Sequence, residues 1–275
     1  MTNIKGFLGA AGFAAIAVLG MSSAALADDA ADGERKFGYS ITITGTSDYI
    51  FRGISLTNND PAFQPFIEFT YGTPSLTWYL DFWGSNVNDG LGNPWELDVY
   101  AGVRPVTGPI SWDLGVLYYT NPSHQATQIN PTDAGTDYVE FKIAATITPI
   151  TNLSLTAVGY VTPDVGFASP TTETGEFDAA YTLPAFGIFT PTISGAVGYT
   201  NADRAGTFDA YCTREFGGTC NPGTDAYTYW NAGVKLTVDK YFMDFRYWDT
   251  SISKQDDPNG YADARFVFQA GVNLP

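Results

Sequence analysis

From Phe37 to Pro275 the chain reads as short runs in which apolar and polar residues alternate, joined by connectors rich in Gly, Pro and Asn. The run at residues 95–104 is the clearest, with the sequence WELDVYAGVR. Alternation with a period of two places the two kinds of side chain on opposite faces of a β-strand. Repeated along a chain, it is typical of a membrane barrel whose apolar face meets lipid and whose polar face lines the interior.

Twelve such runs can be separated. We predict strands at residues 37–50, 63–71, 76–82, 95–104, 112–118, 139–147, 153–162, 175–183, 190–200, 227–238, 241–250 and 263–274. The number is even, as in bacterial outer-membrane barrels. We therefore predict an all-β fold, an up-and-down antiparallel transmembrane β-barrel of about twelve strands.

The connectors between these runs alternate in length. Short connectors are centred on residues 72–75, 105–109, 149–152, 184–187 and 239–240, and long polar ones lie around Asn58, Asp89, Gln125, Pro170, Gly217 and Asp257. Outer-membrane barrels have short periplasmic turns and long extracellular loops, so we expect a periplasmic N-terminus and extracellular long loops. A soluble β-sandwich, the alternative fold, has no reason to sort its loops by length.

The first 27 residues have the features of a secretory signal peptide. Lys5 supplies the positive start, residues 7–19 are apolar, and Ala25-Leu26-Ala27 fits the small-x-small cleavage pattern. The apolar stretch is shorter than the roughly 20 residues of a transmembrane anchor, which is the alternative. We expect cleavage after Ala27, which leaves residues 28–275 as one outer-membrane barrel domain.

Charge and aromatic content narrow the choice of partners. With 29 acidic and 13 basic residues the chain carries a net charge of −16, and it would repel the phosphates of a nucleic acid. Aromatic residues make up 15% of the chain, too many for a disordered acidic protein. On the outward face we expect aromatic girdles and an apolar band that contact outer-membrane lipids, with an ordinary buried core as the alternative. These positions are Tyr71, Trp78, Trp112, Tyr118, Trp230 and Tyr247 in the girdles and Leu80, Val99, Leu114, Ile143 and Leu236 in the band.

The same alternation points charged residues inward. They are Glu68, Asp81, Glu96, Asp98, Arg104, Asp113, Glu140, Lys142, Glu176, Asp178, Lys235, Asp244, Arg246 and Arg265. Nine of these are acidic and five are basic, and rings of carboxylates attract cations. We therefore predict a narrow, water-containing passage that favours cations. The alternative is that the charges pair across the lumen and plug it, since a barrel of about twelve strands has an intermediate width.

Arg52 is a further pore-lining candidate, at the mouth of the first strand beside Asp48. We expect it to reach across the lumen to Asp98 or Glu96. Such a pair either constricts the pore or closes a salt-bridge network that holds the shape of the barrel.

The remaining reactive side chains offer little chemistry. Cys212 and Cys220 lie in the longest loop, where an oxidising envelope favours a disulfide, and two thiols without a nearby His make an incomplete zinc set. His124 beside Ser123 invites comparison with outer-membrane lipases and proteases, but nothing in the sequence requires a nucleophile, base and orienting group to converge. The acidic run at residues 256–260 lacks the ligand spacing of a calcium loop. We therefore expect no enzyme activity, no metal and no cofactor.

Several stretches resemble a known family. Residues 47–55, with the sequence SDYIFRGIS, carry the resemblance most strongly, and residues 83–87, 96–102 and 113–122 follow in the family's order and spacing. They are similar to the TorF-like porin family, also called Gcw_chp. Over the N-terminal half the resemblance rests on specific residues, and over the C-terminal half it rests mainly on the alternation of apolar and polar residues. The resemblance implies an outer-membrane barrel of the porin type, with no established substrate.

The C-terminal end departs from the usual barrel pattern. Such barrels commonly close on an aromatic residue that the barrel-assembly machinery reads, whereas this chain ends Val272-Asn273-Leu274-Pro275. We expect that machinery to be a partner and Phe266 and Phe268 to act as substitutes. The predicted function is passive diffusion of ions or small hydrophilic solutes through a porin-like channel in the bacterial outer membrane. The alternative is a plugged structural or adhesive barrel that acts through its extracellular loops.

Overall fold

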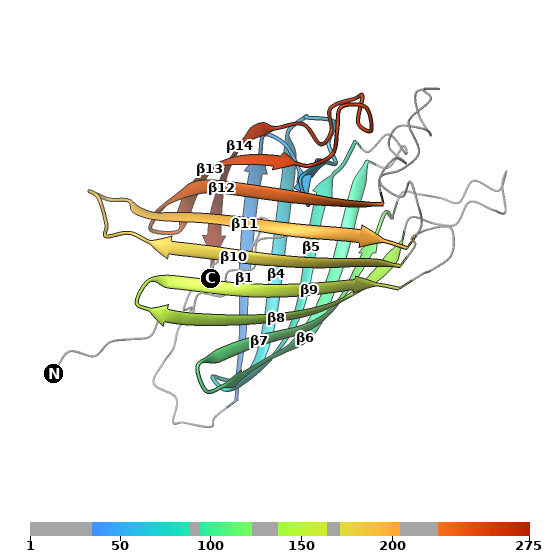
Figure 1. Cartoon of the computed structure of the whole chain (residues 1–275). Coiled ribbons are helices and arrows are strands. Elements are labelled where there is room, and N and C mark those ends of the chain that lie inside the picture. Colours follow the sequence, from blue (N-terminus) through green and yellow to red (C-terminus); the bar gives the residue numbers. More distant parts are fainter. Residues whose placement is uncertain (1–34, 89–93, 123–136, 164–170, 204–224) are drawn as a thin grey trace.

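The computed structural model describes residues 35–88, 94–122, 137–163, 171–203 and 225–275. Within them, twelve strands form one closed antiparallel barrel in which each strand pairs with the next barrel strand along the chain (Figure 1). They are β1 (Lys36–Thr46), β4 (Ala62–Thr73), β5 (Leu76–Asn86), β6 (Trp95–Thr107), β7 (Ile110–Thr120), β8 (Tyr138–Ile150), β9 (Leu153–Thr162), β10 (Thr172–Thr182), β11 (Thr190–Ala202), β12 (Ala226–Val238), β13 (Tyr241–Thr250) and β14 (Arg265–Leu274). Two short strands, β2 (Ile50–Phe51) and β3 (Ile54–Ser55), pair only with each other.

The barrel closes where β1 pairs with β14. Ile43 lies opposite Val272, and Thr46 lies opposite Gln269, in an antiparallel register. Closure pairs the backbone polar groups that an open sheet leaves exposed at its edges. The predicted all-β barrel of about twelve strands is therefore confirmed. The β-sandwich is wrong, because a sandwich needs two separate sheets.

The two faces of the wall differ as the alternation predicts. Trp78 on β5 is 57% exposed and Ile143 on β8 is 53% exposed, whereas their inward neighbours Asp81 and Glu140 are 4% and 1% exposed. None of the eleven outward positions predicted for the girdles and the apolar band is buried. The interpretation of these residues as an ordinary buried core is therefore wrong. The outer face is an apolar surface of the kind that a transmembrane barrel presents to lipid.

The connectors alternate in length around the barrel, as predicted. Tight turns join β4 to β5, β6 to β7, β8 to β9 and β12 to β13, and the longer connectors that lead from β1 to β4 and from β13 to β14 lie at the opposite end (Figure 1). In three of the tight turns a residue adopts a left-handed backbone conformation, Gly108 with φ 59°, Asn152 with φ 69° and Asp239 with φ 53°. Glycine, asparagine and aspartate are the residue types that tolerate this conformation, so the turn chemistry agrees with the register.

The predicted boundaries differ most at the first strand. The strands at 153–162 and 241–250 were predicted at their observed bounds, but β1 ends at Thr46 and not at residue 50. The backbone N–H of Ser47 continues the pairing with β14, at 2.8 Å from the carbonyl oxygen of Phe268. Beyond it the carboxylate of Asp48 accepts hydrogen bonds from the hydroxyls of Ser55 and Thr57, and these bonds turn the chain into the barrel.

Some predictions fall on other parts of the chain. The signal peptide at residues 1–27, the pair Cys212 and Cys220, and His124 lie outside the described residues. They stay predictions from the sequence. Among the residues that the structure describes, no helix has the length and hydropathy of a membrane span.

Candidate functional site

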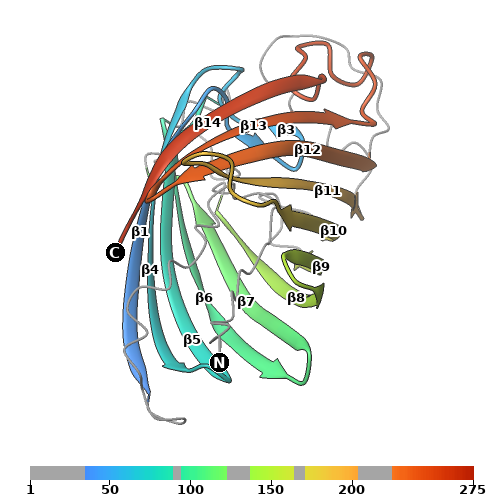
Figure 2. The same ribbon diagram turned by 90° about the vertical axis from the view of Figure 1, so that its left-hand side faces the viewer.

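A hairpin formed by residues 47–59 lies inside the barrel, and we call it the lumen hairpin. Its strands β2 and β3 pair Ile50 with Ser55 and Phe51 with Ile54. The two residues between them have positive φ angles, 48° at Arg52 and 86° at Gly53, as the two-residue turns of right-twisted hairpins require. Figure 2 shows β3 next to β12 and β13, and Ile54 of β3 packs with residues of both strands.

The tip of the hairpin crosses the lumen. The Nη2 atom of Arg52 donates to both carboxylate oxygens of Glu140, each at 2.9 Å. Glu140 belongs to β8, which lies on the opposite side of the barrel from β1. Both side chains are buried, with 5% and 1% of their surface exposed. The expected pairing of Arg52 with Asp98 or Glu96 is therefore wrong, because the hairpin carries Arg52 past β6 to the facing wall.

Glu140 is itself fixed by the wall around it. The hydroxyl groups of Tyr119 on β7 and Thr162 on β9 each donate to its carboxylate at 3.1 Å. The guanidinium carbon of Arg52 lies 4.7 Å from the ring centroid of Tyr160 and 4.9 Å from that of Phe51. Such contacts between a cation and an aromatic face are favourable, most of all away from water. The wall thus supplies a carboxylate and one ring to the guanidinium, and the hairpin itself supplies the second ring.

The electrostatic surroundings keep Arg52 charged. Burial by itself lowers the pKa of the guanidinium, but the carboxylate of Glu140 and the nearby tyrosines raise that pKa well above its usual value. Arg52 therefore carries its positive charge at neutral pH.

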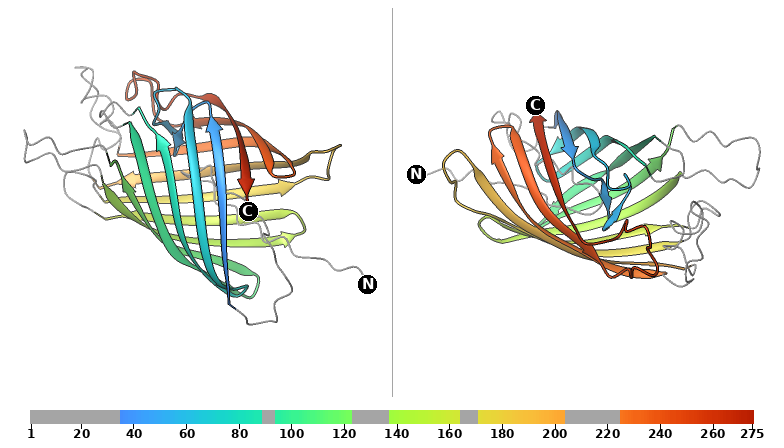
Figure 3. Two further views of the ribbon diagram at one scale, coloured as in Figure 1. Left: turned by 180° about the vertical axis from the view of Figure 1, so that it is seen from behind. Right: turned by 90° about the horizontal axis from the view of Figure 1, so that it is seen from above.

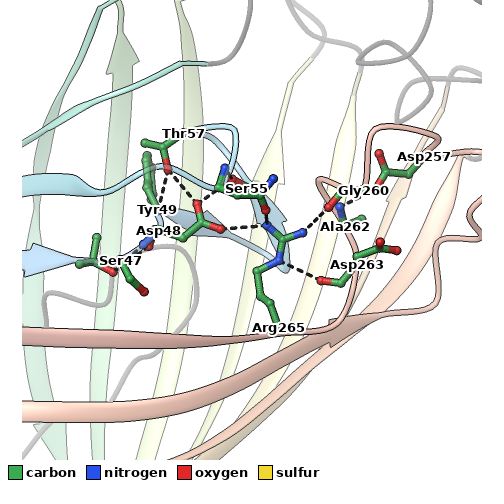
Figure 4. A network of polar contacts seen from close by, with 12 residues as sticks. Ser47, Asp48, Tyr49, Ser55, Thr57, Asp257, Gly260, Ala262, Asp263 and Arg265 are labelled. Atoms are coloured by element: carbon green, nitrogen blue, oxygen red, sulfur yellow. Dashed lines mark hydrogen bonds and ion pairs between the residues drawn. The ribbon is translucent and has the colours of Figure 1, made fainter.

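The base of the hairpin is anchored by Asp48. Its carboxylate accepts hydrogen bonds from Ser55 Oγ at 2.6 Å, Thr57 Oγ1 at 2.8 Å and Arg265 Nη1 at 2.8 Å. Arg265 also donates to the side chain of Asn59 and to the backbone of the connector before β14 (Figure 4). The hairpin is thus tied to the last strand of the barrel at its base, separately from its tip.

Aromatic side chains fill the lumen on both sides of the hairpin. On one side the ring of Tyr49 packs against Trp83 of β5 at a centroid distance of 5.1 Å. On the other side Ile50 and Ile54 pack against a cluster that includes Tyr229 of β12. Figure 3 shows β2 and β3 among the wall strands from two further directions. The hairpin therefore occupies the interior at this level.

A second polar cluster lines β4 to β8. Arg104 lies 2.6 Å from Glu68, 3.7 Å from Asp113 and 3.9 Å from Asp81, and Lys142 lies 2.9 Å from Asp113. Two bases thus neutralise part of a group of three carboxylates. Their mutual pairing is consistent with the predicted alternative in which lumen charges pair with one another.

A third polar cluster lies on the facing wall. Arg246 donates to Asp244 on the same strand at 3.0 Å, and to Ser194 on β11 at 2.8 Å. Acidic groups continue the inner face, where Asp98 accepts a hydrogen bond from Tyr100 and Glu176 accepts one from Tyr229 at 2.8 Å.

The predicted pore-lining residues can now be placed. Those on the wall strands lie on the inner face, and Arg52 projects from the hairpin. They are Arg52, Glu68, Asp81, Glu96, Asp98, Arg104, Asp113, Glu140, Lys142, Asp244, Arg246 and Arg265. Arg265 lies at the base of the hairpin and not at an open section of the lumen. Whether these side chains border a conducting path stays a prediction.

Sequence reasoning placed one inward tyrosine correctly and missed another. Tyr100 follows the inward positions of its strand and is 4% exposed, whereas Tyr119, which is 2% exposed, was not identified as inward. The pair Tyr118-Tyr119 carried the signal, because neighbouring residues on a strand face opposite sides. One ring of that pair must point inward.

The whole chain was compared with known proteins. Residues 30–270 match the family Gcw_chp, described as a bacterial protein of unknown function. No protein with curated annotation matches the sequence. The fold is similar to a structure described as "Unveiling the Mechanism Behind the in-meso Crystallization of Membrane Proteins", with a TM-score of 0.51 and 7% identity over 86% of this chain and 83% of that chain.

Two further solved structures are similar at lower scores. The KdgM porin has a TM-score of 0.49 and 9% identity, over 86% of this chain and 98% of that chain. The COG4313 outer membrane channel from Pseudomonas putida F1 has a TM-score of 0.47 and 10% identity, over 89% of this chain and 96% of that chain. The first similarity, with the higher score, supports the barrel fold alone.

Proposed function

This chain belongs to the Gcw_chp family, and we propose that it is a channel of the TorF-like porin type in the bacterial outer membrane, which passes ions or small hydrophilic solutes by diffusion. The proposal rests on the contrast between the two faces of the barrel wall. The outer face of the wall is apolar, while the inner face holds carboxylates, guanidinium groups and hydroxyls. An apolar outer face suits lipid, and a charged inner face suits water.

The orientation follows from the length of the connectors. We assign the tight turns and the N-terminal end of β1 to the periplasm, and the long connectors to the cell exterior. The lumen hairpin then enters the barrel from the extracellular side. Outer-membrane lipids and the barrel-assembly machinery are the partners that this placement implies.

The sign of the charge inside the lumen favours cations. Carboxylates outnumber bases on the inner face, since nine of the fourteen charged side chains that the alternation points inward are acidic. A low-dielectric wall strengthens the field of such charges and repels anions. We therefore assign the channel a preference for cations.

The hairpin favours a second candidate function. It spans the lumen from β1 to β8 and is packed by aromatic residues on both sides, an arrangement that also suits a plugged barrel acting through its extracellular loops. The two candidates differ in conductance. In the channel the hairpin narrows the path, and in the plugged barrel it closes the path.

Conductance measurements on the purified, full-length protein separate the candidates. In planar bilayers under a potassium chloride gradient, the channel predicts discrete current steps and a reversal potential of the sign for cation preference. A plugged barrel predicts no steps above those of a protein-free bilayer. Swelling of liposomes that contain the same protein, in solutions of small sugars, tests whether uncharged solutes pass through it. Swelling no faster than that of protein-free liposomes would exclude passage of uncharged solutes.

A further inference from the structure

The surroundings of Arg52 have the features of a receptor for a guanidinium group. A carboxylate held in place by two hydroxyl donors accepts both hydrogen bonds from one nitrogen, and two rings lie close to the planar cation. Planar, delocalised cations of this kind combine carboxylate pairing with stacking on aromatic faces, which a compact ammonium group does less well. The receptor is built from β7, β8 and β9 and not from the hairpin, apart from the ring of Phe51.

A second carboxylate faces the same site from β10. Glu176 is 5% exposed and lies within electrostatic reach of Arg52. Its Oε2 atom accepts from the hydroxyl of Tyr229 at 2.8 Å, and its side chain also interacts with that of Asp178 on the same strand. The carboxyl groups around the site therefore outnumber the single guanidinium of Arg52.

The tip and the base of the hairpin are held by separate contacts. At the tip, the Nε atom of Arg52 is buried without an acceptor in the described part of the chain, and the backbone of Arg52 has a left-handed φ of 48°. The base is anchored elsewhere, through Asp48 and Arg265. The tip can therefore leave the site while the base of the hairpin stays bound to the wall.

Leaving Glu140 without a cation would be costly, because a buried carboxylate needs a positive partner. A cation from solution that matches the receptor can supply it. We propose that this receptor is a guanidinium-binding site of the lumen, and that Arg52 is its tethered ligand, which an incoming small guanidinium-bearing solute replaces.

The consequence is a solute class for the channel. Displacement of the tip removes the part of the hairpin that crosses the lumen, so the solute that binds also widens its own path. This consequence rests on the proposed channel function. The binding site itself does not, because it exists whether or not the lumen conducts.

The binding test uses the full chain in detergent with methylguanidinium chloride as the probe. Tyrosine fluorescence and calorimetry are followed in the wild type, in Arg52→Ala, in Arg52→Ala combined with Glu140→Gln, and in Lys254→Met. Lys254 is a matched control, because it loses one positive charge at an exposed ion pair with Asp263. Sodium and methylammonium chloride at equal concentration control for ionic strength and for charge alone.

The expected result is saturable binding of methylguanidinium by Arg52→Ala. The wild type and Lys254→Met, in which Arg52 fills the site, should bind at least about tenfold more weakly, and so should the double variant, because loss of one member of a buried charge pair costs this much or more. Equal binding by Arg52→Ala and the double variant would overturn the proposal. So would equal binding of methylammonium.

The test also covers the case in which Arg52→Ala folds poorly. Folded barrels of this class migrate differently from unfolded chains on a gel run without boiling, so the same titration can be scored as recovery of the folded band. Methylguanidinium should restore that band in Arg52→Ala and not in the double variant. Failure to restore it, together with failure to bind, would refute the site.

Bilayer recordings then separate the two proposals. If the lumen conducts, methylguanidinium should block the potassium current of Arg52→Ala and leave that of the double variant unaffected. Binding without any current would retain the site and reject the channel. Current in Arg52→Ala without binding would retain the channel and reject the site.

Discussion

Asp48 and Arg265, which are 217 residues apart in the chain, lie 2.8 Å from each other between the carboxylate and the guanidinium. The contact joins the start of the lumen hairpin to the first residue of the last strand. It therefore links closure of the barrel to insertion of the hairpin, since both depend on β1 and β14 lying side by side.

Removal of this anchor should destabilise the protein. In Asp48→Ala the guanidinium of Arg265 loses a buried partner, and Ser55 and Thr57 lose their acceptor. A buried pair that loses one member typically costs about 3–5 kcal/mol, so the urea midpoint of the folded barrel in detergent should fall clearly.

The matched control is Lys254→Ala, which breaks an exposed ion pair and should change the free energy of unfolding by less than about 1 kcal/mol. Similar urea midpoints for Asp48→Ala and Lys254→Ala would contradict the role of Asp48 as an anchor.

The hairpin turn should not tolerate a side chain at Gly53. The φ angle there is 86°, and a Cβ atom would lie 2.4 Å from Cγ2 of Thr250 and 3.0 Å from Cβ of Tyr229. We expect Gly53→Val to pull the tip away from the wall and to increase single-channel conductance. Gly175→Val is the control, because that strand position has open space for a Cβ. An unchanged conductance in Gly53→Val would show that the tip does not limit the path.

The outer face should reject a charge. Leu114 is 39% exposed on the apolar surface, and Leu114→Arg should lower the free energy of unfolding by about 2–4 kcal/mol if the residue lies at the bilayer midplane. Leu114→Phe keeps the site apolar and should fold into lipid vesicles like the wild type. Equal folding of the two variants would place Leu114 outside the hydrocarbon region.

The neighbouring inward position is a poor comparison, although the sequence suggests otherwise. Gly115 faces the lumen, so the alternation alone predicts that a charge there is mild for folding. Its Cβ would lie 2.4 Å from the hydroxyl of Tyr79, so any side chain there meets a buried ring. The expectation of mild folding effects at Gly115 is therefore replaced by an expected loss of stability.

Ion preference should respond to bases inside the lumen and not to bases at the surface. Lys142 is 14% exposed beside Asp113, whereas Lys254 is 84% exposed. Lys142→Met should shift the reversal potential further toward cations, because Asp113 loses a neutralising partner. Lys254→Met should leave it unchanged, since exposed charges are screened within about 8 Å at physiological ionic strength. Equal shifts in both variants would argue against selection inside the barrel.

The barrel wall was predictable from the sequence because the pattern of each strand depends only on residues that are neighbours in the chain. A strand that faces lipid on one side and water on the other repeats every two residues, so both its existence and its inward positions follow from the alternation. Glu140 and Arg246 were placed on the inner face in this way. Turn residues such as Asn152 and Asp239 then fixed where each strand ends.

The hairpin was not predictable by the same means. Tyr49, Ile50 and Phe51 continue the apolar content of the first strand, so the chain gives no local sign that it leaves the wall. The partner of Arg52 lies 88 residues away, and it is selected by the length of the hairpin and by the width of the barrel. The resemblance of residues 47–55 to a family marked the segment as special, while its place inside the lumen required the structure.

The most direct test of a cation-selective channel narrowed by the lumen hairpin compares the wild type with Arg52→Ala in planar bilayers under a potassium chloride gradient. Such a channel predicts current steps and a cation-selective reversal potential for both proteins. It also predicts a larger step for Arg52→Ala, because the tip no longer crosses the lumen. An absence of steps in both folded proteins, or a preference for chloride, would contradict it.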